Sequence, residues 1–370
     1  MEAVSLDTGP LAGAGRVVLK IGSSLLVDAD GELRGEWLAS VAEEIASTRT
    51  EFIIVSSGAI ALGRQRLGLP VTMTLAQKKA CAAAGQSRLT QGYERAFQTH
   101  GRIAAQALLT LNDTEDRRRF LNARDTIDTL LAHGVIPVIN ENDTVATDEI
   151  RYGDNDRLAA RVAQLTGADV LVLLSDIEGL YSADPRTDPG ARFIADIDDL
   201  TPDVMEMGEG AGSDVGTGGM RTKLLAARIA MSAGCDTLIH RGDGLYPLRR
   251  LSRDRHTRVR APELGESARR QWIVGHLNPT GRIHVDTGAA EAIVADKSLL
   301  LAGVMRAEGA FEKGDAVDVV CDGLTVARGL ARYGHAETAR ILGRKGRDIE
   351  AVLGYTNGPA LVHRDDLVRF

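Results

Sequence analysis

This 370-residue chain is poor in aromatic residues, which make up 4% of it, although hydrophobic residues together make up 44%. An Ala-, Val- and Leu-rich composition of this kind favours an α/β protein over an all-β one. The chain has no run of about 18 apolar residues, and its N-terminus lacks the charged-then-apolar pattern of a signal peptide. We therefore expect a soluble, cytoplasmic protein with no membrane segment and about two domains.

The chain also has few cysteines and no excess of positive charge. Cys81, Cys235 and Cys321 lie far apart and form no C-x-x-C motif, so we expect them to be reduced, buried and structural. No His and Cys spacing suits zinc. The formal net charge of −7 argues against general nucleic-acid binding, which usually needs a basic excess. Only seven of the 44 basic residues are lysines. Because arginine is so much commoner here, a lysine can mark a site that needs a compact point charge rather than a planar guanidinium.

Apolar runs alternate with helical patterns as far as His240. This alternation predicts an α/β fold in which helices cover both faces of a mainly parallel sheet, a three-layer sandwich. Ligands of such sheets bind at the carboxyl ends of the strands. Strands are predicted at Arg16–Ile21, Phe52–Ser56, Ile103–Leu109, Val135–Asn140, Val170–Ser175 and Thr237–His240. Helices are predicted at Leu38–Ala46, Leu75–Phe97, Phe120–Leu131, Asp154–Leu165 and Met220–Ala233.

The composition changes near Arg241 and predicts a domain boundary. Two prolines and six arginines crowd residues 246–262, which we interpret as the start of a linker over 246–269. Residues 270–370 contain short β-like runs between Gly and Asp turns, typical of a small β-rich domain. With a loose tail over 1–14, the first domain is expected to cover 15–245.

The segment from Gly216 to Lys223, Gly-Thr-Gly-Gly-Met-Arg-Thr-Lys, runs directly into a helical pattern. Its glycines allow positive φ and close approach of the backbone to a ligand. Free N–H groups at the helix N-terminus attract anions, and Lys223 adds an ammonium. The segment is not a P-loop, because Gly-Lys-Ser/Thr is missing. It is interpreted as a phosphate site, with a flexible surface loop as the alternative.

Three strand ends carry further candidates. Lys20 precedes Gly22 in a turn whose amides can face a phosphate, although an exposed strand-end lysine is the alternative. Ser57 lies in a small-residue turn where a ligand can rest on the backbone; a nucleophilic serine is rejected because Gly-x-Ser-x-Gly is absent. Ser175 and Asp176 end a buried strand and could hold a nucleotide base or ribose, or simply cap the strand end.

Acidic and amide side chains are concentrated between Asn140 and Asp156. Helix capping needs only one such residue, so we interpret the group as a pocket for a small zwitterion. Asp143 or Asn155 would reach its α-amino group. An acidic metal site is the alternative, although EF-hand spacing is absent.

Several motifs, and the order in which they follow one another along the chain, resemble those of the amino-acid kinase superfamily, specifically the bacterial glutamate kinases. They are VVLKIGSS, VSSGAIALG, AAAGQSRL, RFLNARDT, VIPVINENDTVAT, YGDND, LLSDIEGLYSADPR and GTGGMRTK. The C-terminal part resembles a PUA domain, so the resemblance covers roughly residues 15–370. NEND with GDND is specific to the glutamate kinase branch, whereas GTGGMRTK is shared more widely. The resemblance implies an amino-acid kinase fold followed by a PUA domain.

The resemblance also implies a role for each matching residue. Ser57, Asp143 and Asn155 would bind glutamate. Asp156 would hold Lys20 and Lys223 in place, and these three would form the catalytic set. The ATP-binding residues would be Lys20, Ser175, Asp176, Thr217, Gly218, Gly219, Met220, Arg221, Thr222 and Lys223.

The activity implied is transfer of the γ-phosphoryl group of ATP to the γ-carboxylate of L-glutamate, giving L-glutamyl 5-phosphate for proline synthesis. Similar enzymes need Mg²⁺, which we expect to be held mainly by the nucleotide phosphates and water; they form tetramers or dimers and are inhibited by proline. Alternatives are a sibling kinase acting on aspartate, acetylglutamate or a nucleoside monophosphate, or an RNA-binding PUA protein. RNA binding is disfavoured, because residues 270–370 hold 13 basic and 13 acidic residues.

Overall fold

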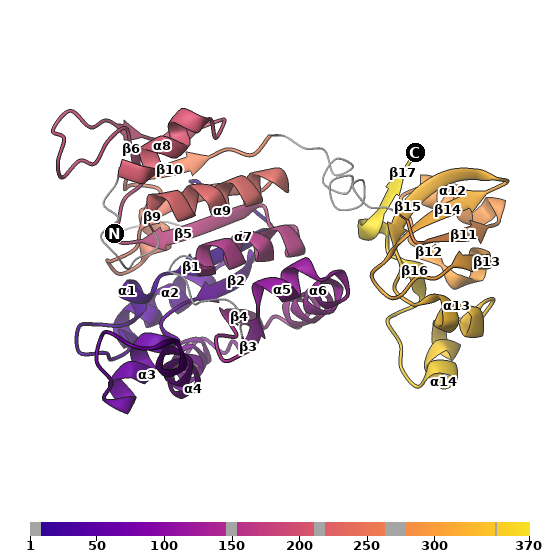
Figure 1. The fold of residues 1–370 in the computed structure, drawn as a ribbon, viewed down its shortest axis with the longest axis horizontal. Helices are drawn as coiled ribbons and strands as arrows, with labels where there is room; N and C mark the ends of the chain where they lie inside the picture. Colours follow the sequence, from indigo (N-terminus) through magenta and orange to yellow (C-terminus); the bar gives the residue numbers. More distant parts are fainter. Residues whose placement is uncertain (1–8, 146–153, 211–218, 263–278, 345) are drawn as a thin grey trace. The chain divides into compact units, whose positions relative to one another are not determined.

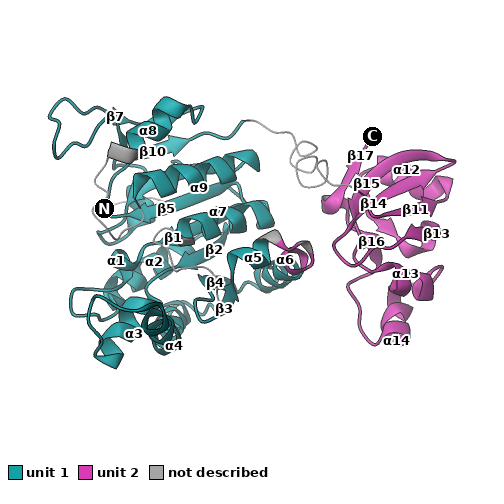
Figure 2. Ribbon diagram, viewed as in Figure 1, with its two compact units in different colours: residues 1–115, 122–262 teal, residues 116–121, 263–370 magenta. Residues whose placement is uncertain are grey.

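The computed structural model describes all of the chain except residues 1–8, 146–153, 211–218, 263–278 and 345. It divides into two compact units (Figure 2). Unit 1 comprises residues 1–115 and 122–262, and unit 2 comprises residues 116–121 and 263–370. The boundaries at 245 and 270 expected from composition stay predictions. Among the described residues, no helix combines the length and apolar character needed to cross a membrane.

Unit 1 is built on an eight-stranded sheet in the order β3-β4-β2-β1-β5-β9-β10-β8 (Figure 1). The strands from β3 to β9 are parallel, and β10 pairs antiparallel with β9. The predicted mainly parallel sheet is thus confirmed. The strands are β1 (Arg16–Ile21), β2 (Glu51–Ser56), β3 (Ala104–Leu109), β4 (Ile136–Glu141), β5 (Val170–Ser175), β8 (Asp196–Ile197), β9 (Asp236–Arg241) and β10 (His256–Val259).

Helices cover both faces of this sheet. Because strand side chains alternate between faces, Val17 and Leu19 of β1 pack in the core with α2 and α4, whereas Lys20 faces α7 and α9. The helices are α1 (Ser23–Leu26), α2 (Gly35–Ala46), α3 (Ala59–Leu67), α4 (Leu75–Gln98), α5 (Leu111–Glu115), α6 (Arg117–Ala132), α7 (Asp154–Thr166), α8 (Pro202–Gly210), α9 (Met220–Ser232) and α10 (Pro247–Arg250). A small hairpin pairs β6 (Leu180–Tyr181) with β7 (Phe193–Ile194).

Helices α3 and α4 touch through their backbones. A Cβ added at Gly63 would lie 1.8 Å from the carbonyl oxygen of Cys81, and one at Gly85 would lie 1.9 Å from that of Ala59. Only glycine fits either position. This contact fixes the start of α3, which follows the Ser57 turn, against the middle of α4.

The first half of the predicted linker is part of unit 1. Residues 247–250 form α10, and β10 extends the sheet beyond β9. Thr257 secures this strand, because its hydroxyl donates to the Ile194 carbonyl at 2.6 Å and accepts from the Leu180 N–H at 2.8 Å. We did not predict β10 because arginines dominate this segment. In the structure, the partly exposed His256 and Arg258 alternate with buried Thr257 and Val259. Residues 263–269, the rest of the predicted linker, lie outside the described residues.

A buried carboxylate joins α2 to α10. Glu44 has no exposed surface and accepts the backbone N–H groups of Leu248 at 3.2 Å and Arg249 at 2.6 Å. Burial raises its pKa to about 7, although these hydrogen bonds and the Arg249 charge act in the opposite direction. Ionising Glu44 therefore costs folding free energy.

This carboxylate predicts a pH dependence of stability. Because the folded pKa lies above the unfolded one, the contribution of Glu44 is complete below about pH 4.5 and is lost as the pH rises through about 7. The melting temperature of the wild type should therefore fall between pH 5 and pH 8 relative to that of Glu44→Gln. Glu36→Gln, an exposed change on the same helix, should follow the wild type. Parallel curves for wild type and Glu44→Gln would contradict the assignment.

Unit 2 is β-rich, as predicted. Its five-stranded sheet has the order β13-β11-β14-β15-β17, and β12 pairs with β16. Its core includes Phe311, Tyr333 and Leu361. The elements are β11 (Gly281–Val285), α12 (Thr287–Val294), β12 (Leu299–Leu300), β13 (Val304–Gly309), β14 (Ala316–Cys321), β15 (Leu324–Leu330), α13 (His335–Ile341), α14 (Ile349–Leu353), β16 (Ala360–Val362) and β17 (Leu367–Arg369). All three cysteines of the chain are buried and free.

Candidate active site at the carboxyl ends of the strands

Most of the predicted site residues that the structure describes lie at one edge of the sheet. Lys20 is near the end of β1, Ser57 follows β2, Asp143 follows β4, and Ser175 ends β5. These strands run parallel as neighbours in the order β4-β2-β1-β5, so their carboxyl ends share an edge. This is where α/β sheets bind ligands.

Asp156 holds both candidate lysines. Its Oδ1 lies 2.7 Å from Lys20 Nζ, and its Oδ2 lies 3.3 Å from Lys223 Nζ. The Thr222 hydroxyl donates to Oδ2 at 3.0 Å. Asp156 has no exposed side-chain surface, while the Lys20 and Lys223 side chains are 10% and 4% exposed. Strand β1 and helices α7 and α9 thus converge on one carboxylate.

The charges in this cluster set its protonation state. Burial alone would raise the pKa of Asp156, but the two ammonium groups and their hydrogen bonds hold it down at about 2. The pKa of Lys223 is lowered, first by burial and then by the Lys20 charge, against the attraction of Asp156. One carboxylate thus serves two ammonium groups, and the cluster carries an excess of positive charge. Such a cluster suits an anionic ligand.

Helix α9 adds backbone donors to this charge. Gly219 is its N-cap, and the N-terminal end of a helix is where backbone N–H groups and the helix dipole favour an anion. The Thr222 hydroxyl also contacts the Gly219 carbonyl at 2.8 Å. Met220 is buried and Arg221 is exposed. Thr217 and Gly218 lie outside the described residues.

A polar pocket surrounds Asn155, the residue next to Asp156. Its Nδ2 lies within hydrogen-bond distance of the Ser56 carbonyl (3.1 Å), Ser57 Oγ (2.8 Å) and Asn140 Oδ1 (3.2 Å). Its Oδ1 is buried and has no hydrogen-bond partner among the described residues. Asp143, the third residue predicted to bind substrate, is buried as well. Within the described part of the chain, Asn155 Oδ1 is thus an acceptor without a donor.

Ser175 and Asp176 lie on the other side of β1. The Ser175 hydroxyl donates to Asp176 Oδ1 at 3.0 Å, and Ser175 is buried while Asp176 is exposed. The charge of Asp176 also acts on Lys223. The structure thus brings this pair into electrostatic range of the lysine cluster.

The sequence reasoning missed residues that support the pocket. Asn140 was included in the predicted polar pocket without a role of its own, and Gln86 only in a motif, yet Asn140 Nδ2 donates to Gln86 Oε1 at 2.8 Å. Tyr93, fully buried on α4, donates to Ser56 Oγ at 2.9 Å. Gln86 and Tyr93 are separated by about two turns of α4, and this periodicity was the available signal. The contact between α4 and the strand ends could not be read from it.

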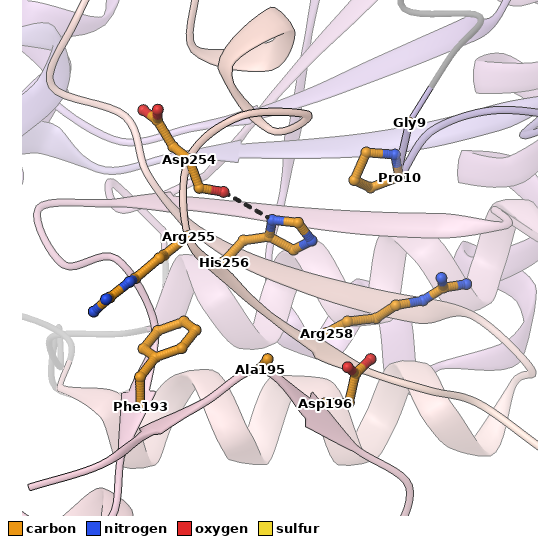
Figure 3. A pocket seen from close by; sticks show the side chains of 9 residues that line it. All are labelled: Gly9, Pro10, Phe193, Ala195, Asp196, Asp254, Arg255, His256 and Arg258. Atoms are coloured by element: carbon orange, nitrogen blue, oxygen red, sulfur yellow. Dashed lines mark hydrogen bonds between the residues drawn. The ribbon is translucent and has the colours of Figure 1, made fainter.

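A separate depression of about 600 Å³ opens beside β10 (Figure 3). Segments 9–10, 193–196 and 254–258 line it, and it contains none of the predicted site residues. Its charges are largely paired, Arg258 with Asp236 and Asp254 with Arg250. The Arg255 guanidinium lies over the Phe193 ring. We do not assign the active site to it.

The described residues contain no group of three or more His, Cys, Asp and Glu side chains that could hold a metal ion.

Comparison with known proteins agrees with the fold and the motifs. The model of the amino acid kinase family matches residues 15–240, and that of the PUA domain matches residues 281–353. Glutamate 5-kinase of Agrobacterium fabrum is 51% identical, over 99% of this chain and 95% of the relative. Glutamate 5-kinase of Paramagnetospirillum magneticum is 52% identical, over 97% and 99%.

Among solved structures, carbamate kinase from Giardia lamblia bound to AMP-PNP has a TM-score of 0.50. It is 17% identical and the match covers 68% of this chain and 99% of that one, a likeness that concerns the fold alone. The long, highly identical matches and the family model carry the assignment. The chain therefore belongs to the amino acid kinase family, in its glutamate 5-kinase branch, and carries a C-terminal PUA domain.

Proposed function

We propose that this protein transfers the γ-phosphoryl group of ATP to the γ-carboxylate of L-glutamate, giving L-glutamyl 5-phosphate, the first step of proline synthesis. One observation carries the proposal. Asn155 and Asp156 are consecutive residues of α7 that contact two different groups of side chains. Asp156 contacts Lys20 and Lys223, and Asn155 hydrogen-bonds in the amide pocket. This arrangement supports a phosphate-binding half of the proposed site next to an acceptor-binding half. The relatives' name supplies the identity of the acceptor.

The chemistry needs positioning and charge stabilisation rather than a base. A carboxylate acceptor is already ionised at neutral pH, so no proton has to be removed before it attacks. The barrier comes from repulsion between two anions and from charge on the transferring group. Lys20 and Lys223 would stabilise that charge, and Asp156 would fix their positions. These three residues form the proposed catalytic set.

We assign the nucleotide to the side of the site where α9 begins. The loop from Thr217 to Lys223 would bind the phosphates through backbone N–H groups, and Ser175 with Asp176 would contact the nucleoside. Mg²⁺ would neutralise phosphate charge when bound. Because both oxygens of Asp156 already contact Lys20, Lys223 or Thr222, we propose that phosphate oxygens and water hold the ion.

Ser57, Asp143 and Asn155 would bind glutamate. A buried carboxylate and an unused amide oxygen suit its ammonium group. Asp143→Ala should therefore raise the KM for glutamate at least tenfold, with kcat and the KM for ATP changed much less. Asp30→Ala, an exposed change in the same unit, should leave all three constants unchanged. A loss confined to kcat would move Asp143 from substrate binding to catalysis.

The proposed function is tested by trapping its product. Protein, ATP, Mg²⁺, glutamate and hydroxylamine should yield a hydroxamate, because hydroxylamine attacks the acyl phosphate and displaces inorganic phosphate. The hydroxamate gives a coloured complex when iron(III) is added. Colour that does not exceed a control without glutamate would overturn the proposal. By family resemblance we further propose a cytoplasmic homo-oligomer, tetramer or dimer, that proline inhibits at a site overlapping that of glutamate.

A further inference from the structure

Four side-chain amides form a hydrogen-bonded chain that leads away from the pocket. Asn155 Nδ2 donates to Asn140 Oδ1 (3.2 Å), and Asn140 Nδ2 donates to Gln86 Oε1 (2.8 Å). Gln86 Nε2 then donates to Gln106 Oε1 at 3.1 Å. The four residues come from α7, β4, α4 and β3 in that order. We call them the amide relay.

The first three amides of the relay each donate to the next one, so their hydrogen bonds all run in the same direction and end at Gln106 Oε1. A side-chain amide has donors on nitrogen and acceptors on oxygen, so reversing one member would place two donors or two acceptors together. Thr90 secures the far end, because its hydroxyl contacts both Gln106 Oε1 and the Gln86 carbonyl. The near end is secured by the contacts of Asn155 Nδ2 with Ser57 Oγ and the Ser56 carbonyl. These contacts together set the orientation of each amide, and that of Asn140 is set also by the Glu141 N–H, which donates to its Oδ1 at 2.9 Å.

This direction determines what Asn155 offers to a ligand. With Nδ2 committed to the relay, Oδ1 is the atom left over, and it is buried without a hydrogen-bond partner among the described residues. Because buried acceptors are nearly always hydrogen-bonded, we expect the ligand to supply a donor to this oxygen. The α-ammonium of an amino acid is such a donor, and the bond to it is charge-assisted.

We propose that Gln86 is a positioning residue for the amino-acid substrate, because through Asn140 it holds the Asn155 amide with Oδ1 toward the substrate ammonium. This inference rests on the proposed function and extends it to a residue on α4. Gln86 acts on the ammonium alone, so its loss should weaken ligands that carry one and spare ligands that do not.

The test compares glutamate with glutarate, which has both carboxylates but no ammonium. Gln86→Met keeps the length of the side chain and removes its hydrogen bonds. It should raise the KM for glutamate about tenfold, while the inhibition constant of glutarate and the KM for ATP stay within about twofold. Gln91→Met, an exposed change on the same helix, should leave all three constants unchanged.

Two results would overturn the inference. If Gln86→Met weakened the binding of glutamate and glutarate equally, Gln86 would only support the shape of the pocket. An unchanged glutamate KM would mean that the relay does not orient Asn155.

Gln106→Met provides a second variant, because Gln106 is exposed and its change is less able to disturb folding. It should raise the glutamate KM in the same selective way, by a smaller factor. A wild type that forms no hydroxamate from glutamate would overturn the proposed function as well, which distinguishes the two failures.

Discussion

Replacing Lys223 by alanine is expected to lower kcat by a factor of about 10²–10³, the usual effect of removing one preorganised donor at a developing negative charge. Lys223 is 4% exposed and is held by Asp156, so its ammonium is fixed in place before the substrates bind. Little reorganisation is then needed when charge develops on the phosphoryl group. Steady-state kinetics with saturating ATP and glutamate measures the effect.

A matched lysine separates this effect from a general loss of charge. Lys297→Ala removes an exposed lysine from unit 2 and should leave kcat unchanged. If Lys223→Ala instead raised only the KM for ATP, Lys223 would contribute equally to binding the ground state and the transition state. Its assignment to catalysis would then be wrong.

Replacing Asp156 by asparagine is expected to lower the free energy of unfolding by about 3–5 kcal/mol, because two buried ammonium groups would lose their counter-charge. The pKa of Asp156 is lowered to about 2, so in the wild type its stabilising contribution is present above about pH 3.8 and is lost as the pH falls through about 2. Urea unfolding at neutral pH, where this contribution is complete, measures the loss.

Removing one ammonium together with the carboxylate provides the control. The double variant Lys20→Met and Asp156→Asn has one uncompensated buried charge fewer, so it should recover part of the lost stability. A single variant as stable as the wild type would show that the cluster contributes no net free energy to folding. The bridge would then serve catalysis alone.

Much of the kinase unit could be predicted from the sequence because its strands are buried on both faces. Such strands are continuous apolar runs, and the six predicted for the first domain, such as Val170–Ser175, lie within one residue of the observed ones. Site residues that directly follow these runs were found for the same reason. Ser57 after β2 and Asp176 after β5 are examples.

Contacts between distant segments could not be predicted in this way. Strand β10 was taken for a linker because its pairing with β9 is not encoded in a local apolar run. The hydrogen bond between Gln86 and Asn140 joins α4 to β4, and the close packing of α3 on α4 at Gly63 and Gly85 likewise involves separate segments. The raised pKa of Glu44 likewise depends on its burial against α10. The periodicity of one helix indicates which face is buried, but not what covers it.

The claim that Asn155 and Asp156 join a phosphate half to a glutamate half is tested most directly by ADP release across a set of acceptors. With ATP and Mg²⁺, the wild type should release ADP rapidly with glutamate, and at no more than the background rate with aspartate, N-acetylglutamate or a nucleoside monophosphate. Release that is fastest with any of the other acceptors would contradict the claim and assign the pocket around Asn155 to that acceptor.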